Sequence, residues 1–190
     1  MKHILRMLVI VIVFLFVLFV SGVAGGSVSA VDTTPVATQA TSAQGAKEYF
    51  LPYPGILPDH PLYKIKLVRD WILERIIVDP IRKTEFYILQ GDKRLNMGIA
   101  LVEKGNSALA GEVISQSGNF MEQAMHTLTS IKTAGREVPL YVLEHMESAL
   151  VKHNDVLETM RVNQSGSAES VIIDAQKHIQ ALRQDIAKVR

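Results

Sequence analysis

Histidine and methionine side chains recur close together in the second half of the chain. Met121, Met125 and His126 follow one another within a few residues, and His145 and His153 come next along the sequence. A spacing of four residues points Met121 and Met125 to the same side of a helix. Thioether and imidazole groups together suit copper, and imidazole also suits zinc. These five residues are therefore the candidate ligands of a metal site.

A structural interpretation of the same residues is also open. Methionine at core spacing usually fills gaps between apolar side chains. A lone histidine on an apolar stripe is usually buried and hydrogen-bonded, or it fixes the register of a helix. His145 and His153 are two helical turns apart, so a shared metal would need ligands from other helices.

The motifs of the common enzyme classes are absent from the sequence. It contains no phosphate-binding loop, no dinucleotide fingerprint, no H-E-x-x-H and no G-x-S-x-G. With no cysteine, a thiol nucleophile and a disulfide are both excluded. Acidic pairs such as Glu144 and Glu147 stand among lysines and arginines, as on an ordinary solvated face. We therefore expect a protein that is not an enzyme and that has no cofactor.

Residues 1–30 have the three parts of an export signal. Lys2 and Arg6 give a basic start, Leu8–Val20 is an unbroken apolar run, and small residues follow up to Ala30. The alternative is an uncleaved membrane anchor, because about 20 apolar residues can span a bilayer. The glycines and serines after Val20 favour cleavage. Either way, we expect the rest of the chain outside the cytoplasm, in the cell envelope or secreted.

The charge of the chain argues against nucleic acid as a partner. The 190 residues include 20 basic and 19 acidic side chains. Removal of residues 1–30 deletes Lys2 and Arg6, which leaves 18 basic against 19 acidic groups. A nearly neutral domain lacks the basic patch that binding to phosphate groups requires.

Residues 31–48 read as a flexible linker, because they are rich in Thr, Ala, Gln and Ser and nearly devoid of large apolar side chains. The folded domain is expected over residues 49–190. Its prolines fix an extended course for Tyr49–Pro58. We predict a strap across the bundle, and a proline-rich ligand for a partner's groove is the alternative. The strap would present these apolar side chains: Phe50, Leu51, Tyr53, Ile56 and Leu57.

Apolar residues at helical spacing predict five helices in the rest of the chain. No strand-like alternation occurs, and short loops between long amphipathic helices indicate antiparallel neighbours. The predicted fold is all-α, an up-and-down antiparallel bundle. The expected helices cover about 61–77, 80–104, 107–134, 139–162 and the segment after residue 167. The first of them places these apolar residues at helical spacing: Leu62, Ile65, Val68, Ile72 and Ile76.

Two features of the second helix carry further predictions. Asp79 is placed to cap it, with Pro80 at the first helical position. Gly91 and Gly98 lie beside its seven-residue apolar repeat, although a glycine inside a helix costs about 1 kcal/mol. We interpret them as a site where a neighbouring backbone packs closely, with neutral drift as the alternative.

The first helix is expected to begin in the same way as the second. Asp59 would cap it, as Asp79 caps the second helix, and Pro61 would be its first residue.

The proline-rich segment and the two helices after it resemble a bacterial domain family of unknown function, found in exported and surface-anchored proteins. The family pattern is roughly P-G-x-L-P-D-S-P-L-Y, then D-P-x-K-K-x-E, then A-E-R-R-L, and the similarity covers about residues 50–104. His60 departs from it by replacing a capping serine, and Gly91 and Gly98 by replacing alanines. The matching residues are Pro54, Gly55, Leu57, Pro58, Asp59, Pro61, Leu62, Tyr63, Asp79, Pro80, Lys83, Glu85, Arg94 and Leu95.

The resemblance implies an exported helical bundle and supplies no catalytic residues. We therefore expect a non-enzymatic domain, tethered to or released from the envelope, that acts through protein–protein contacts. An apolar helix stripe would receive a protein partner or a second copy, and the N-terminal segment would contact the membrane if it stays uncleaved. The alternative is an envelope protein that binds copper or zinc through the His and Met residues above.

Overall fold

A computed structural model describes residues 48–162 and 167–189, which belong to one compact unit, Gln44–Arg190. The expected export signal and nearly all of the linker lie outside the described residues. Within these residues the regular structure is entirely α-helical, so the predicted all-α class and five helices are confirmed, with ends within about two residues of prediction. The helices are α2 (Tyr63–Ile76), α3 (Pro80–Glu103), α4 (Ser107–Thr133), α5 (Leu140–Val162) and α6 (Ser167–Val189).

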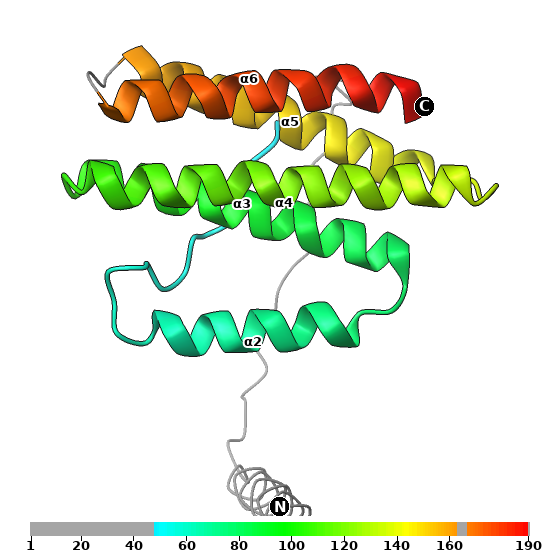
Figure 1. The fold of residues 1–190 in the computed structure, drawn as a ribbon, viewed down its shortest axis with the longest axis horizontal. Coiled ribbons are helices and arrows are strands. Elements are labelled where there is room, and N and C mark those ends of the chain that lie inside the picture. The colour runs from blue at the N-terminus through cyan, green and yellow to red at the C-terminus, as the bar shows by residue number, and fades with distance from the viewer. Residues whose placement is uncertain (1–47, 163–166, 190) are drawn as a thin grey trace, which may run out of the picture. The chain divides into compact units, whose positions relative to one another are not determined.

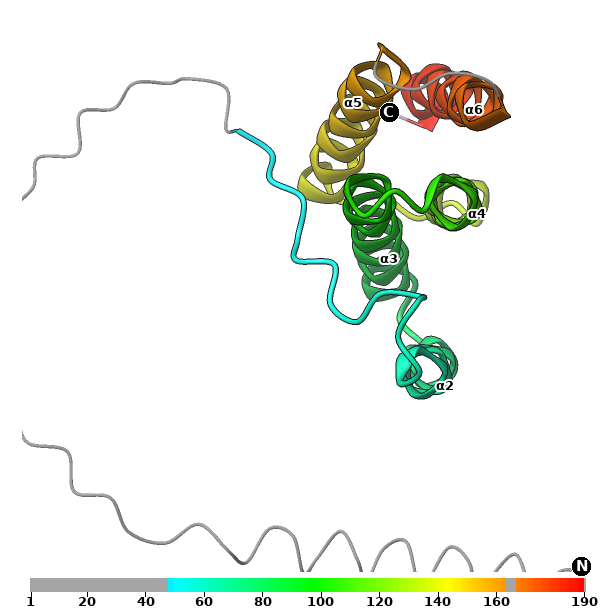
Figure 2. The same cartoon turned by 90° about the vertical axis from the view of Figure 1, so that its left-hand side faces the viewer.

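Four of the helices close on one another, and α2 stands outside them. Helix α3 packs against α4 and α5, and α6 packs against the same two helices. Figure 2 shows α3, α4, α6 and α5 end-on as a ring, and α2 lies outside this ring next to α3. In Figure 1, α2 and α6 are the outermost helices. Because α3 has neighbours on several sides, it is buried around most of its circumference.

The core lies between these four helices and is built from residues 49–189 alone. The apolar repeat of α5 is buried and consists of Leu143, Met146, Leu150, Leu157 and Met160. The repeat of α6 is buried except for the half-buried Ala175 and consists of Ile172, Ala175, Ile179, Leu182, Ile186 and Val189. This self-contained core gives residues 44–190 the features of an independently folding domain. The largest fully buried side chains are Ile88, Leu95, Met97, Leu101, Ile114, Met121, Leu128, Met146, Leu150, Leu157, Ile172 and Ile179.

Helix α3 approaches α4 closely at its two buried glycines. A Cβ atom added to Gly98 would lie 2.6 Å from Cγ1 of Ile114, and one added to Gly91 would lie 2.9 Å from Cε of Met121. Real Cβ atoms do not approach other atoms this closely. The absence of a side chain at Gly98 therefore allows the observed packing against Ile114, whereas at Gly91 the close atom is the flexible end of Met121.

The start of α3 follows the sequence prediction, and the start of α2 does not. Asp79 accepts a hydrogen bond of 2.8 Å from the Arg82 N–H, and Pro80 is the first helical residue. Helix α2, in contrast, begins at Tyr63, two residues after Pro61. The carboxylate of Asp59 does not cap it, because this group pairs with Nζ of Lys104 at 2.9 Å.

His60 takes part in the turn that leads into α2. Its Nδ1 accepts a hydrogen bond of 3.2 Å from the Leu62 N–H, and its carbonyl accepts one of 3.0 Å from the Tyr63 N–H. The imidazole thus binds the backbone of this turn, although no side chain caps the first turn of α2.

The proline-rich segment packs on the helices through only part of its apolar side chains. Leu51 and Leu57 are half-buried against the two core clusters, but Phe50 is 72% exposed and Tyr53 is 82% exposed. The backbone of the segment is held by side chains of the helices, because Asn96 donates a hydrogen bond of 2.8 Å to the Pro52 carbonyl. Backbone bonding, the two leucines and the half-buried Tyr49, rather than the whole apolar set, fix its course.

Candidate functional site

A network of polar side chains, buried at Asp92 and His153 and half-buried at Tyr49 and His145, joins the proline-rich segment to α3 and α5. Asp92 on α3 is its centre: Oδ1 accepts a hydrogen bond of 2.8 Å from Nε2 of His153 on α5, and Oδ2 accepts one of 2.5 Å from the Tyr49 hydroxyl. The same hydroxyl lies 3.1 Å from Nε2 of His145, also on α5. Burial and the nearby Asp92 carboxylate raise the pKa of Tyr49, so its hydroxyl stays a proton donor.

One end of this network has the composition of a hydrolase triad. The Ser117 hydroxyl lies 3.4 Å from Nδ1 of His153, whose other nitrogen is bonded to Asp92. All three residues are at most 3% exposed, and the serine hydroxyl donates to the Gly91 carbonyl at 2.9 Å. A nucleophile must reach its substrate, and this serine is covered and already hydrogen-bonded. The network is an architectural feature that ties α3, α4 and α5 together.

The five predicted metal ligands lie in different environments. Met121 and Met125 are buried in the core, whereas the neighbouring His126 is exposed. His145 and His153 belong to the polar network and are linked to each other through Tyr49 and Asp92. Among residues 48–162 and 167–189, no three His, Cys, Asp or Glu side chains are grouped as a metal site requires.

Sequence reasoning identified His153 and His145 but missed their partners. Asp92 follows Gly91 on a helix face that the sequence marks as buried, and a carboxylate there needs a buried partner. The expected burial of Asp92 was therefore the sign in the sequence that this residue has a polar partner. Nothing in the sequence relates it to a histidine 61 positions further on.

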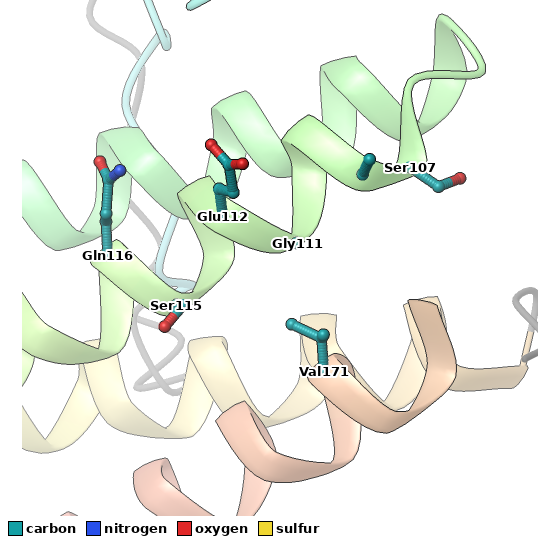
Figure 3. A pocket seen from close by; sticks show the side chains of 7 residues that line it. Ser107, Gly111, Glu112, Ser115, Gln116 and Val171 are labelled. Atoms are coloured by element: carbon teal, nitrogen blue, oxygen red, sulfur yellow. The ribbon is translucent and has the colours of Figure 1, made fainter. Parts of the chain in front are cut away.

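A shallow groove of about 600 Å³ runs between the first turns of α4 and the start of α6 (Figure 3). Gly111 and Val171 face each other across it, and Glu112 and Gln116 extend away from Val171. Its lining contains one carboxylate, hydroxyl groups and an amide, without a histidine or a cation. These groups do not form an acid–base pair or a charged cradle, so the groove offers little chemistry.

The most unusual surface of the domain is the outward face of α2. This face, hereafter the α2 apolar face, consists of Ile65, Val68, Ile72 and Ile76, which are 66%, 57%, 43% and 66% exposed. An apolar stripe on a helix beside a bundle normally turns toward the core. In α2 it points to solvent.

Charged groups occupy the side of α2 that meets α3. Lys66 and Asp70 are buried there, and Glu74 accepts a hydrogen bond of 2.9 Å from the Tyr87 hydroxyl. Burial, reinforced by the Arg94 guanidinium, lowers the pKa of Lys66 to about 8. Asp70 uses Oδ1 to pair with Arg69, and its Oδ2 has no hydrogen-bond partner within the described part of the chain. Helix α2 is therefore held mainly by polar contacts.

The opposite surface of this interface explains why polar groups of α2 turn inward. Helix α3 presents Arg94, buried and stacked 4.3 Å over the Phe120 ring, with Nη1 donating to Gln90 at 2.7 Å. Burial lowers the pKa of this guanidinium. An isoleucine packed against the Arg94 guanidinium would remove more water from it and would supply no hydrogen-bond acceptor. The nearby Asp70 carboxylate offsets part of the charge of Arg94.

Basic side chains flank the α2 apolar face. Lys64 and Arg75 lie along one edge and Arg69 along the other, and all three are exposed. The indole of Trp71, 54% exposed, lies on the same edge as Arg75, whose guanidinium is 4.6 Å from the ring centre.

Among residues 48–162 and 167–189, no helix is both long and apolar enough to cross a membrane.

Comparison with known proteins places this architecture in a family. Residues 55–167, more than half of the chain, match the family described as a domain of unknown function, DUF5667, and the chain belongs to this family. No curated protein and no solved structure shows a significant match. The family description names no activity.

Proposed function

We propose that this DUF5667 protein is a non-enzymatic helical domain that is exported and acts at the cell envelope through surface contacts. On this proposal, an up-and-down bundle, preceded by its proline-rich strap, carries a contact surface on its outermost helix, α2. Protein–protein contacts are the form that the sequence led us to expect. One observation carries the proposal: α2 exposes its aliphatic residues and buries Lys66 and Asp70.

The energetics favour covering this face. Burying an isoleucine or valine side chain completely contributes about 1.5–3 kcal/mol. The four residues of the α2 apolar face are roughly half exposed. Covering them would therefore contribute on the order of 3–6 kcal/mol before the cost of association. That supports a reversible contact rather than a permanent one.

The weak attachment of α2 to the bundle supports the same proposal. A polar interface with an unpaired carboxylate oxygen on Asp70 stabilises a helix less than an apolar one does. A helix held in this way opens more readily than the four helices of the ring. Contact with a partner would stabilise α2 by mass action.

The alternative of copper or zinc binding has no comparable support. It would require the predicted ligands to converge from different helices. Met121 and Met125 lie in the apolar core, and His126 lies on the surface. His145 and His153 are already engaged by Tyr49 and Asp92.

Cysteine labelling tests the proposed contact surface directly. The chain has no native cysteine, so a single introduced thiol reports on one position only. Val68→Cys places it on the α2 apolar face, and Val151→Cys places it on the exposed surface of α5 as the matched control. Both would be made in the full chain, expressed in bacterial cells, and in purified residues 44–190, and treated with a membrane-impermeant maleimide.

The two positions should behave differently. In the purified domain both thiols should react, because both parent valines are exposed. At the envelope of intact cells, Val68→Cys should react several-fold more slowly while Val151→Cys keeps its rate. Equal rates for Val68→Cys in the two settings would overturn the proposal that this face is covered.

A further inference from the structure

We infer that the surface covering the α2 apolar face is a lipid bilayer rich in anionic headgroups. This inference rests on the proposed function, because it names the partner of the same face. It is carried by the sorting of charge around α2, by the position of the tryptophan and by the chain that precedes the domain.

The aliphatic residues form one continuous strip along α2. Ile65, Val68 and Ile72 follow each other in steps of three and four, and Ile76 continues the series, so all four lie on one side. Lys64 borders this strip. A helix that lies in a membrane surface has this form, with its apolar strip in the acyl boundary and basic side chains reaching up to the headgroups.

The charges of α2 are largely sorted by sign, with Lys66 as the basic residue that shares the inward side with the acidic ones. Its two acidic residues, Asp70 and Glu74, both face α3, where Asp70 is buried and Glu74 is bonded to Tyr87. Three of its basic residues border the outward face instead: Lys64, Arg69 and Arg75. Arg69 remains paired with Asp70 at 2.7 Å, so Lys64 and Arg75 supply the uncompensated charge. A surface that is apolar in the middle and cationic at its edges is complementary to anionic lipid.

Trp71 is placed where a membrane-surface helix needs an aromatic anchor. Its indole lies at the edge of the apolar strip, between the strip and the bundle, and it is 54% exposed. Tryptophan prefers the boundary between headgroups and acyl chains because its ring is apolar and its N–H is polar.

The same charge pattern disfavours a second copy of this chain as the occupant. Two α2 apolar faces packed together would bring Lys64, Arg69 and Arg75 of each copy close to the same residues of the other. Like charges across an interface oppose association. A protein partner would need an acidic rim around an apolar centre, and we retain it as an outcome of the test.

The chain that precedes the domain also points to a bilayer. Leu8–Val20 is an uninterrupted apolar run, and residues 31–48 follow it as the expected linker. A linker of this length reaches at most about 65 Å when extended. If the N-terminal segment is retained as an anchor, this linker tethers the domain that carries α2 to the membrane, which raises the effective concentration of α2 at the lipid surface.

Tryptophan fluorescence tests the inference with purified residues 44–190. The chain contains a single tryptophan, so emission reports on α2 alone. Vesicles of equal parts phosphatidylglycerol and phosphatidylcholine should shift the emission of Trp71 to the blue and carry the domain with them on sedimentation. Vesicles of phosphatidylcholine alone should bind it at least ten-fold more weakly, and added salt should weaken binding to the anionic vesicles.

Paired variants show whether the α2 apolar face makes this contact. Val68→Gln/Ile72→Gln should reduce vesicle binding at least ten-fold. Leu140→Gln/Val151→Gln, which changes two exposed aliphatic residues of α5, should leave it unchanged. All four parent side chains are exposed, so circular dichroism should show the same helix content and a similar melting temperature in both variants.

The outcomes separate this inference from the proposed function. No blue shift on anionic vesicles, equal binding to neutral vesicles, or equal loss in both variants would each overturn it. If vesicles do not bind but Val68→Cys is still protected at the envelope, a protein covers the face; the proposed function then stands and the lipid inference fails. If Val68→Cys is unprotected and vesicles do not bind, both fail.

Discussion

His153 on α5 donates a hydrogen bond of 2.8 Å from Nε2 to Oδ1 of Asp92 on α3, and both side chains are buried. This pair lies at the centre of the network that also holds Tyr49. A buried hydrogen-bonded pair has directional requirements that apolar packing lacks, so it fixes the rotation of α5 against α3. The histidine that the sequence offered as a metal ligand thus has a structural role.

Replacing His153 with alanine should lower the free energy of unfolding by about 3–5 kcal/mol. The substitution removes one partner of a buried pair and leaves the Asp92 carboxylate without its imidazole donor. Urea unfolding followed by circular dichroism measures the change. His126→Ala, at an exposed histidine on α4, is the matched control and should stay within about 0.5 kcal/mol of the parent. A loss below about 1 kcal/mol for His153→Ala would contradict the assigned role.

Gly98→Ala and Gly111→Ala should have opposite effects on stability. A Cβ at Gly98 would overlap Ile114 on α4, and overpacking of this kind costs about 1–3 kcal/mol. The nearest atom to a Cβ at Gly111 is 3.4 Å away on Val171, an ordinary contact. There the higher helix propensity of alanine should stabilise the domain by up to about 1 kcal/mol. Thermal melting distinguishes the two, and equal shifts would show that the close packing of Ile114 against Gly98 is unimportant.

Lys66→Met should stabilise the domain, and the gain should shrink as the pH rises. Burial of Lys66 lowers its pKa to about 8 from the ordinary value of 10.5, so the charged form destabilises the folded state. Between these pH values the unfolded chain binds more protons, and parent stability therefore rises with pH. The advantage of Lys66→Met should be largest below pH 8, on the order of 1–2 kcal/mol after allowance for solvent screening.

The surroundings of Lys66 determine how this measurement is made. The positive groups of Arg94, Lys93 and Arg69 favour loss of its proton, and Asp70 opposes it. Burial and Glu74 raise the pKa of Tyr87 to about 12, so parent and variant alike lose stability above pH 10 as tyrosines ionise in the unfolded chain. Urea unfolding from pH 6 to 9.5 avoids that range. A constant difference across it would contradict the pKa shift.

Copper and zinc should leave the melting temperature of residues 44–190 unchanged. The side chains of Met121 and Met125 point into the apolar core, and His145 and His153 are held by Tyr49 and Asp92. Calorimetry with and without each metal gives the readout, together with the metal content of the purified protein. A stoichiometric metal and a higher melting temperature, both lost in His145→Ala or Met125→Ala, would instead support the metal-binding alternative.

The helices themselves were predictable from the sequence. Apolar residues at helical spacing located all five, and Asp79 with Pro80 marked the beginning of α3. These signals are local, because a cap or a breaker acts within one turn of the chain. The predicted cap of α2 was wrong because its residue has a partner elsewhere in the fold. Asp59 pairs with Lys104, and α2 begins without the Asp59 carboxylate.

The candidate site was decided by tertiary structure. The apolar spacing of α2 is as regular as that of α5, yet the stripe of α5 is buried and that of α2 is exposed. The pairing of His153 with Asp92 is likewise invisible in either helix alone. Periodicity tells which residues share a side of a helix. Which side turns inward depends on the groups of the neighbouring helix. Helix α3 presents the Arg94 guanidinium and the Tyr87 hydroxyl. The polar side of α2 can form hydrogen bonds and charge interactions with these groups, and an aliphatic side cannot.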